Sequence, residues 1–121
     1  MIHEIKSFDW PAFCQRVSQQ RAGAIVNLEV IETNGSKTER VASATLQSMV
    51  FDKTAACNDV ITLRLRNTRE IVHEILDPIQ ITLQTSGESG DFNPVQIKAE
   101  SGTTTITMAI HAQMLEGFKT G

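Results

Sequence analysis

The 121-residue sequence has no tyrosine, one tryptophan and two cysteines, Cys14 and Cys57. Two cysteines without a C-x-x-C spacing are too few for a disulfide framework and lack a metal or redox pattern, so we expect two free thiols. No apolar run approaches the roughly 20 residues that cross a membrane. The first ten residues mix charged and apolar side chains, without the hydrophobic region of a secretory signal. We therefore expect a cytoplasmic protein that does not enter membranes.

The sequence also lacks a basic excess, since its formal net charge is -3. Nonspecific nucleic-acid binding depends on neutralising phosphates and needs a basic face, so this function is disfavoured. Arg64, Arg66 and Arg69 form the one basic cluster, and no aromatic residues lie between them for base stacking. They are weak candidates for an RNA or anion surface, and a solvated face is the plainer interpretation.

Length and composition predict one globular domain over residues 1–121. Hydrophobic residues make up 40% of the chain and charged residues 21%, which are ordinary values for a folded domain. We expect a helix at 10–21, a β region at 24–110 and a C-terminal tail at 111–121. The apolar residues of the tail could close the sheet or meet a second subunit.

A helix is predicted from Trp10 to Arg21. Asp9 suits the N-cap, where its side chain would accept backbone N–H bonds, and Pro11 is tolerated in the first turn. Gly23 suits a left-handed conformation after the last turn. The residues at positions i, i+3, i+4 and i+7 form one apolar stripe, and they are Trp10, Phe13, Cys14 and Val17.

After Gly23 the apolar period changes to two, which is typical of strands. Asn34-Gly35 suits a two-residue hairpin turn, and that turn would place Glu29 opposite Arg40 and Glu32 opposite Lys37. The second strand is expected over Thr38 to Phe51, bent or bulged, because its alternating face is weak. That face would comprise Ala42, Ala44, Leu46, Ser48 and Val50.

A third strand is predicted at residues 59–66, where the apolar positions alternate cleanly. The next segment, 69–76, has apolar residues at both helical and alternating spacing, and we favour a strand. A three-residue loop would then align the two strands, and the expected pairs are Leu65–Ile71, Ile61–Ile75 and Arg66–Glu70.

Asp77-Pro78 is expected to turn the chain into a strand with Ile79, Ile81 and Leu83 on one face. The polar stretch 86–94 reads as a surface loop. A two-residue turn at Ser101-Gly102 would then join the last two strands. In that register Val95, Ile97 and Ala99 face Met108, Ile106 and Thr104, and the other face carries Thr103, Thr105 and Thr107 toward water.

No catalytic, metal or cofactor pattern stands out. His3, His73 and His111 are widely spaced, and alternation along a strand would separate His73 from Glu74. A threonine nucleophile needs an adjacent base, and along the sequence only His111 lies near the threonines. We predict no catalytic residue, no cofactor and no metal.

The motifs FDWPAF near the start and IKAESGTTTITM near the end, with the Asp77-Pro78 turn, resemble a small bacterial family of uncharacterised proteins. The resemblance spans residues 8 to 108. Because that family has no assigned activity, it implies no catalytic residue for this chain. The polar loop and the tail depart from the family pattern.

We therefore predict an α+β fold, with one N-terminal helix packed on an antiparallel sheet or partly closed barrel of six to seven strands. The leading functional hypothesis is a non-catalytic protein-interaction module, with a homodimer or another protein as the partner. An Sm-like, RNA-binding barrel is one alternative, on topology alone. A ligand carrier or enzyme that uses His73 or His111 is the other.

Overall fold

The computed structural model describes residues 2–35, 38–85, 92–109 and 117–118. Within these residues, one α-helix and eight strands confirm the α+β class. In chain order the elements are β1 (Ile2–Ile5), the 3-10 turn η1 (Ser7–Asp9), α1 (Trp10–Arg21), β2 (Ile25–Glu32), β3 (Thr38–Lys53), β4 (Asp59–Arg66), β5 (Glu70–Leu76), β6 (Pro78–Gln84), β7 (Phe92–Ala99) and β8 (Gly102–Ala109).

The predicted count of six to seven strands is wrong because β1 was missed. β1 has only four residues, too few to show alternation, and its partner β6 lies far along the chain. The predicted helix, by contrast, has the observed bounds Trp10–Arg21.

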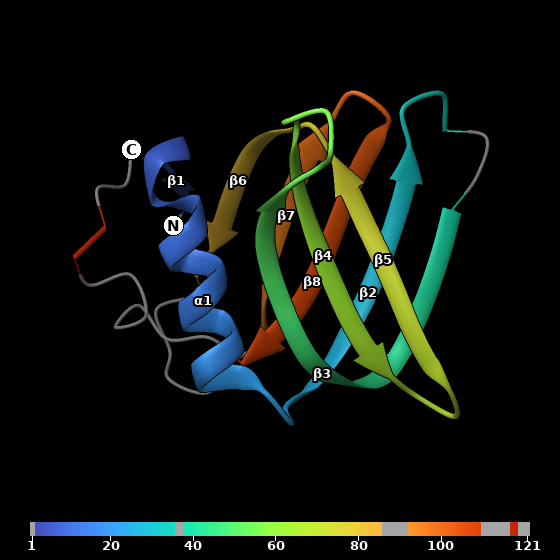
Figure 1. The fold of residues 1–121 in the computed structure, drawn as a ribbon. Coiled ribbons are helices and arrows are strands. Elements are labelled where there is room, and N and C mark those ends of the chain that lie inside the picture. Colours follow the sequence, from blue (N-terminus) through green and yellow to red (C-terminus); the bar gives the residue numbers. More distant parts are fainter. Residues whose placement is uncertain (1, 36–37, 86–91, 110–116, 119–121) are drawn as a thin grey trace.

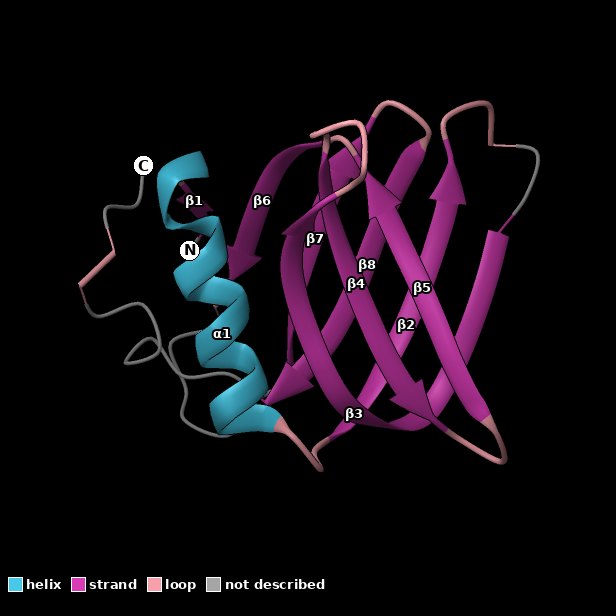
Figure 2. Ribbon diagram, in the orientation of Figure 1, coloured by secondary structure: helices cyan, strands magenta, loops and turns pink. Residues whose placement is uncertain are grey.

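All strands belong to one antiparallel sheet in the order β1-β6-β7-β8-β2-β3-β4-β5. The sheet curls over itself, so β3, β4 and β5 lie in front of β8 and β2 (Figures 1 and 2). β3 makes the corner, because its first half pairs with β2 and its second half with β4. Within the described residues the sheet therefore has two layers and two ends, β1 and β5, and it does not close into a barrel.

The inner faces of both layers build one core. One row crosses the back layer through paired residues of β6, β7, β8 and β2, and these residues are Ile81, Ile97, Thr104 and Val30. Opposite it, the front layer contributes buried Leu63, Leu65 and Met49. As predicted, alternate residues point to water, and Thr103, Thr105 and Thr107 lie on the outer face.

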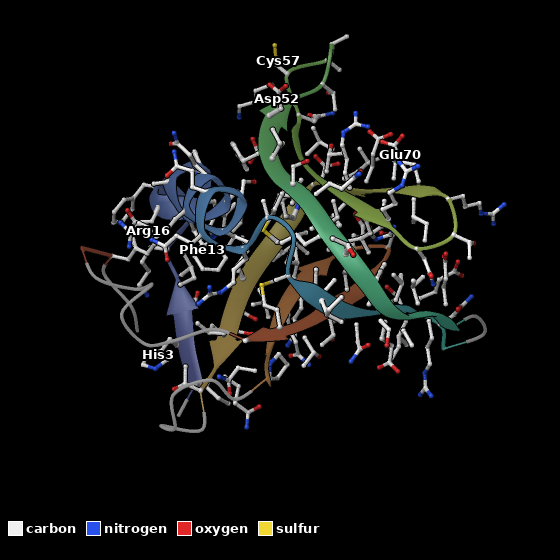
Figure 3. The ribbon with its side chains drawn as sticks, turned by 90° about the horizontal axis from the view of Figure 1, so that it is seen from below. His3, Phe13, Arg16, Asp52, Cys57 and Glu70 are labelled. Atoms are coloured by element: carbon white, nitrogen blue, oxygen red, sulfur yellow. The ribbon has the colours of Figure 1, made fainter. Side chains whose placement is uncertain are left out.

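Helix α1 closes one side of the curl (Figure 3). Its predicted stripe is buried in the core. The Trp10 Nε1–H donates to the Ile5 carbonyl of β1 over 2.9 Å, and the Ser18 hydroxyl donates to the Met49 carbonyl of β3 over 2.6 Å. The helix thus connects the β1 end of the sheet to the front layer.

The expected cap of α1 is wrong in one respect. Asp9 makes no side-chain capping bond to the helix, because η1 runs directly into α1 and leaves Asp9 with helical dihedrals. Gly23 does have the expected positive φ of 89°, and its N–H donates to the Leu46 carbonyl of β3. The chain therefore passes from the helix directly onto the sheet.

Two bulges in β3 correct its predicted face. The pairing shifts by one residue around Ser43, which has φ 55°, and again at Gln47. Each extra residue reverses the alternation, so the inward residues are Val41, Ala44, Leu46, Met49 and Phe51. Ala42 and Val50, expected on that face, are exposed. The predicted pair of Glu29 with Arg40 is confirmed, with 2.7 Å between Glu29 Oε2 and Arg40 Nε.

The β4–β5 hairpin is confirmed in type and register. The segment 69–76 forms a strand, and Leu65–Ile71, Ile61–Ile75 and Arg66–Glu70 pair as expected. The exposure of β5 alternates along the strand, so the two-residue alternation gave the correct assignment over the helical alternative.

Two predictions near β6 and β8 need correction. A bulge at Ile79 turns this side chain outward, and it is 66% exposed instead of joining Ile81 and Leu83. The β7–β8 register is also shifted by two residues, so Ile97 pairs with Thr104 and Ala99 with Gly102. A two-residue shift keeps every side chain on its expected face.

The shifted register has a steric reason. It places Gly102 against β2, where a Cβ at position 102 would lie 2.4 Å from the Ile31 carbonyl oxygen. Only glycine permits this approach. The turn therefore consists of Glu100 and Ser101, and the backbone of Thr33 donates to Ser101 from β2's end.

Several predictions lie outside the described residues. These are the pairing of Lys37, residues 86–91 of the polar loop, and His111 with most of the tail. Phe118 is described, and it packs on α1. Its ring meets Phe13 edge-on at 6.2 Å, and the Arg16 guanidinium lies 4.2 Å from the ring centre.

Candidate functional site

The sheet has an open edge along β5. Among the described residues, β5 pairs only with β4, and it lies at the front end of the curl, away from α1 (Figure 1). The backbone bonds of Asp77 N to Asp59 O, and of Asn67 N to Arg69 O, bracket this hairpin. Antiparallel ladders alternate between bonded and non-bonded pairs. The odd-numbered residues of β5 therefore form backbone hydrogen bonds to β4. The even-numbered residues direct their backbone N–H and C=O groups outward, away from β4 and along the plane of the sheet.

These outward groups belong to Glu70, Val72, Glu74 and Leu76. Edge strands are usually protected from pairing with other chains by bulges, proline, lysine or short length. β5 has seven residues in unbroken register with β4, and neither proline nor lysine. Val72 and Leu76 are 49% and 53% exposed on its outer face. This edge is therefore suited to accept another strand.

The other open edges are protected. β1 is four residues long, and its Ile5 carbonyl already accepts from Trp10. The first half of β3, residues 38–44, pairs only with β2 among the described residues, but it ends in the bulge at Ser43. Compared with β1 and the first half of β3, β5 has the fewest obstacles to strand addition.

A pocket of about 390 Å³ lies beside β5, between the two layers. His73 and Ile75 contribute from β5, Val30 and Glu32 from β2, and Thr104 from β8. The His73 ring reaches across the opening, with its Nε2 3.0 Å from the Thr104 hydroxyl. Burial lowers the pKa of His73 below its ordinary 6.5, and the Glu39 carboxylate opposes this shift in part. Near neutral pH the imidazole is therefore uncharged.

Along the sequence only His111 lies near the threonines, and for Thr104 this prediction is wrong. The curl of the sheet brings His73, which is 31 residues away in the sequence, to Thr104. A neutral imidazole bonded to a hydroxyl has the geometry of a base and a nucleophile. However, the Thr104 side chain is buried, and the pair satisfies its own hydrogen bonding. The arrangement is that of a structural histidine at the edge of the core, whose ring is held by one hydrogen-bond partner.

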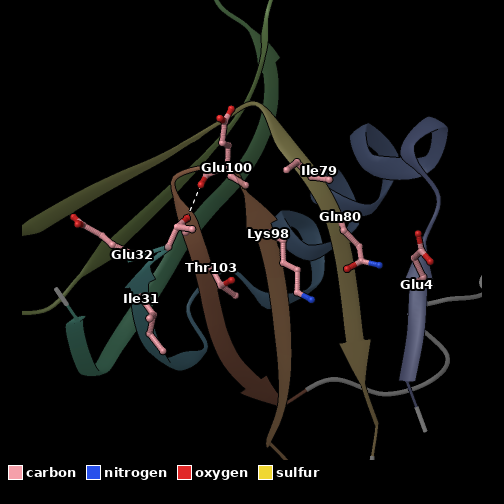
Figure 4. Close-up of a pocket in the computed structure, with 11 residues that line it drawn as sticks. Glu4, Ile31, Glu32, Ile79, Gln80, Lys98, Glu100 and Thr103 are labelled. Carbon is pink, nitrogen blue, oxygen red and sulfur yellow. Dashed lines mark hydrogen bonds between the residues drawn. The ribbon is translucent and has the colours of Figure 1, made fainter. Parts of the chain in front are cut away.

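A second pocket, of about 600 Å³, lies on the outer face of the back layer (Figure 4). Its lining mixes acidic Glu4 and Glu100, basic Lys98, and the exposed side chains Ile31 and Ile79. The Thr33 hydroxyl donates to the Glu100 carbonyl at its rim. No single charge or strongly apolar floor defines a ligand here.

The three arginine candidates lie at the β4–β5 hairpin. Arg64 and Arg66 lie on the outer face of β4, and Arg69 lies in the loop, all exposed. Glu70 sits within the cluster, opposite Arg66 in the register, with its Oε1 3.1 Å from Arg64 Nη1 (Figure 3). The cluster is thus partly neutralised, and an anion role for it stays a prediction.

Other chemistry is sparse in the part of the chain that the structure describes. No group of three His, Cys, Asp or Glu side chains there could hold a metal ion. Both cysteines are free thiols: Cys14 is buried in α1, and Cys57 is exposed at the tip of the β3–β4 loop (Figure 3). None of the described helices has the length and apolar character needed to span a membrane.

Comparison with known proteins identifies the family. Residues 1–115 match the family described as a family of unknown function, DUF5335. The chain belongs to this family. No curated protein and no solved structure matches it. The resemblance expected over residues 8 to 108 is confirmed at the level of a family of unknown function, and it extends further toward both ends.

Proposed function

We propose that this DUF5335 chain is a non-catalytic, single-domain protein-interaction module that binds an extended segment of a partner along β5. The observation that carries the proposal is the unprotected edge, with four outward residues and half-exposed Val72 and Leu76. A cytoplasmic location in bacteria fits the composition and the family resemblance noted above.

The edge offers both affinity and selectivity to such a partner. Backbone N–H and C=O groups of an added strand would bond to the outward groups of β5, and side chains on its two faces would meet different surfaces. On the outer face they would meet Val72 and Leu76. On the inner face they would enter the pocket beside His73 and Val30.

The asymmetry of the fold supports the same proposal. Helix α1 covers one side of the curl. Its Trp10 side chain bonds to β1 and its Ser18 side chain bonds to β3. Among the described residues no helix covers the β5 side, and the β7–β8 turn at Glu100 and Ser101 lies beside its Leu76 end. A partner strand would occupy the position that α1 leaves uncovered.

A library of displayed extended peptides, panned against the purified chain, tests this function. We expect the selected peptides to shift the amide resonances of Glu70, Val72, Glu74 and Leu76. Val72→Pro should abolish binding because it removes an outward N–H while keeping every bond to β4. Val72→Ala is the matched control, because it retains the N–H and should still bind. Selected peptides that bind Val72→Pro as well as the wild type would contradict the proposal.

A further inference from the structure

We infer that the partner strand is β5 of a second copy of this chain, paired antiparallel about a twofold axis that passes through His73. The inference rests on the proposed function and names its partner. It is argued from the backbone parity of β5 and from the charges along the strand.

Only the even-numbered residues of β5 direct their backbone groups to the open edge, and this limits the registers in which two copies can pair. When the twofold axis is perpendicular to the sheet, both copies keep their inner faces on the same side. Each residue then lies opposite one of the same parity. Strongly overlapping pairings are centred on Val72, on His73 or on Glu74, and in each the even-numbered residues form the bonded pairs.

Charge selects among the three registers. Centring on Val72 places Glu70 opposite Glu74 of the second copy, twice by symmetry, and centring on Glu74 places this carboxylate opposite itself. Like charges directly opposite each other are destabilising. Centring on His73 avoids both pairs, since Glu70 faces Leu76 and Glu74 faces Val72. It also continues beyond the strand ends with Arg69 opposite Asp77.

The His73-centred register also buries the apolar side chains of the edge. On the outer face the two Val72 side chains become diagonal neighbours, and on the inner face Ile71 lies opposite Ile75. All four outward residues, from Glu70 to Leu76, find bonded partners in this register. The two other registers leave one end of this set unpaired.

Cysteine cross-linking reads the register directly. In a Cys57→Ser background, His73→Cys should form a disulfide with its own copy, because the two Cα atoms would be a non-bonded pair about 4.5 Å apart. Val72→Cys and Glu74→Cys are the matched controls, because their own copies would be diagonal and about 7 Å away or more. We expect His73→Cys to cross-link at least about tenfold faster under mild oxidation. Faster cross-linking at either control position would overturn the register.

Sedimentation equilibrium provides a readout that leaves His73 in place. The wild type should show a reversible dimer at high micromolar concentration, because one strand pair is a small interface. Arg69→Glu would place like charges opposite each other and should weaken the dimer roughly tenfold, whereas Arg69→Lys should not. A wild type that stays monomeric overturns the inference. If the monomeric protein binds the selected peptides and Val72→Pro abolishes this binding, the edge binds a different partner and the proposed function stands.

Discussion

The Nε2 atom of His73 lies 3.0 Å from the Oγ1 atom of Thr104, and this contact joins the two layers of the sheet at their open side. His73 belongs to β5 and Thr104 to β8, which are at separate places in the strand order. The bond therefore exists only because the sheet curls. It is the polar contact between the two layers that borders the proposed binding edge.

Removing the Thr104 hydroxyl should destabilise the fold. Thr104→Val keeps the shape of the side chain but leaves a half-buried imidazole nitrogen without its partner, which costs about 1–2 kcal/mol in the free energy of unfolding. Thr105→Val, on the outer face, should change it by less than about 0.5 kcal/mol. Urea unfolding measures both. Equal stability of the two variants would show that the bond does not form in solution.

Acid should weaken the fold through His73. Its folded pKa is lowered by burial, so as pH falls the unfolded chain takes up the proton first, and the free energy of unfolding decreases. This loss begins as pH falls toward the ordinary value of 6.5 and ends below the folded pKa. Well above pH 6.5, His73 contributes nothing to the pH dependence of the free energy of unfolding.

The measurement for this is urea unfolding of the wild type and His73→Gln at a series of pH values and low micromolar concentration. The variant should lack the portion of the slope that His73 contributes. An NMR titration should place the His73 midpoint below 6.5. Identical pH profiles for the two proteins would contradict the assignment.

Gly102 should not tolerate a side chain. In Gly102→Ala the Cβ would lie 2.4 Å from the Ile31 carbonyl oxygen, which is backbone and cannot rotate away. We expect a loss of roughly 1–3 kcal/mol in the free energy of unfolding, or a displaced β8. Ser101→Ala, one residue earlier and exposed, is the control and should be close to neutral. A fully stable Gly102→Ala would contradict the β2–β8 register.

The two thiols should react at very different rates. Burial raises the pKa of Cys14 to about 12, whereas Cys57 is exposed. An aromatic disulfide reagent at about pH 8 should therefore label one thiol per folded chain, and two after unfolding. Cys57→Ser should abolish the fast reaction. Rapid labelling of that variant would show that α1 leaves the sheet.

Local patterns predicted most of the fold. The helix stripe, the β2–β3 pair Glu29–Arg40 and the β4–β5 register all depend on residues close in the sequence, and all were confirmed. The errors occur where a distant strand decides the outcome. The short β1 depends on β6, and the position of the last turn depends on the approach of Gly102 to β2.

The candidate site was less predictable. The sequence shows the alternation of residues 70–76 but not that this strand ends the sheet, because strand order is a property of the assembled fold. For the same reason the contact between His73 and Thr104, which were predicted on separate strands, could not be seen in the sequence. The bulge at Ile79 was also invisible, since the clean alternation of β6 continued through it in the sequence.

The order of the strands has a consequence for synthesis on the ribosome. From β2 to β5 each strand pairs with the next one made, so this part can assemble while the chain is still growing. β1 must wait for β6, and the second side of β2 must wait for β8. Until the last described strand emerges, β2 and β5 are both available to neighbouring nascent chains, and pairing between them at that stage would compete with the native fold.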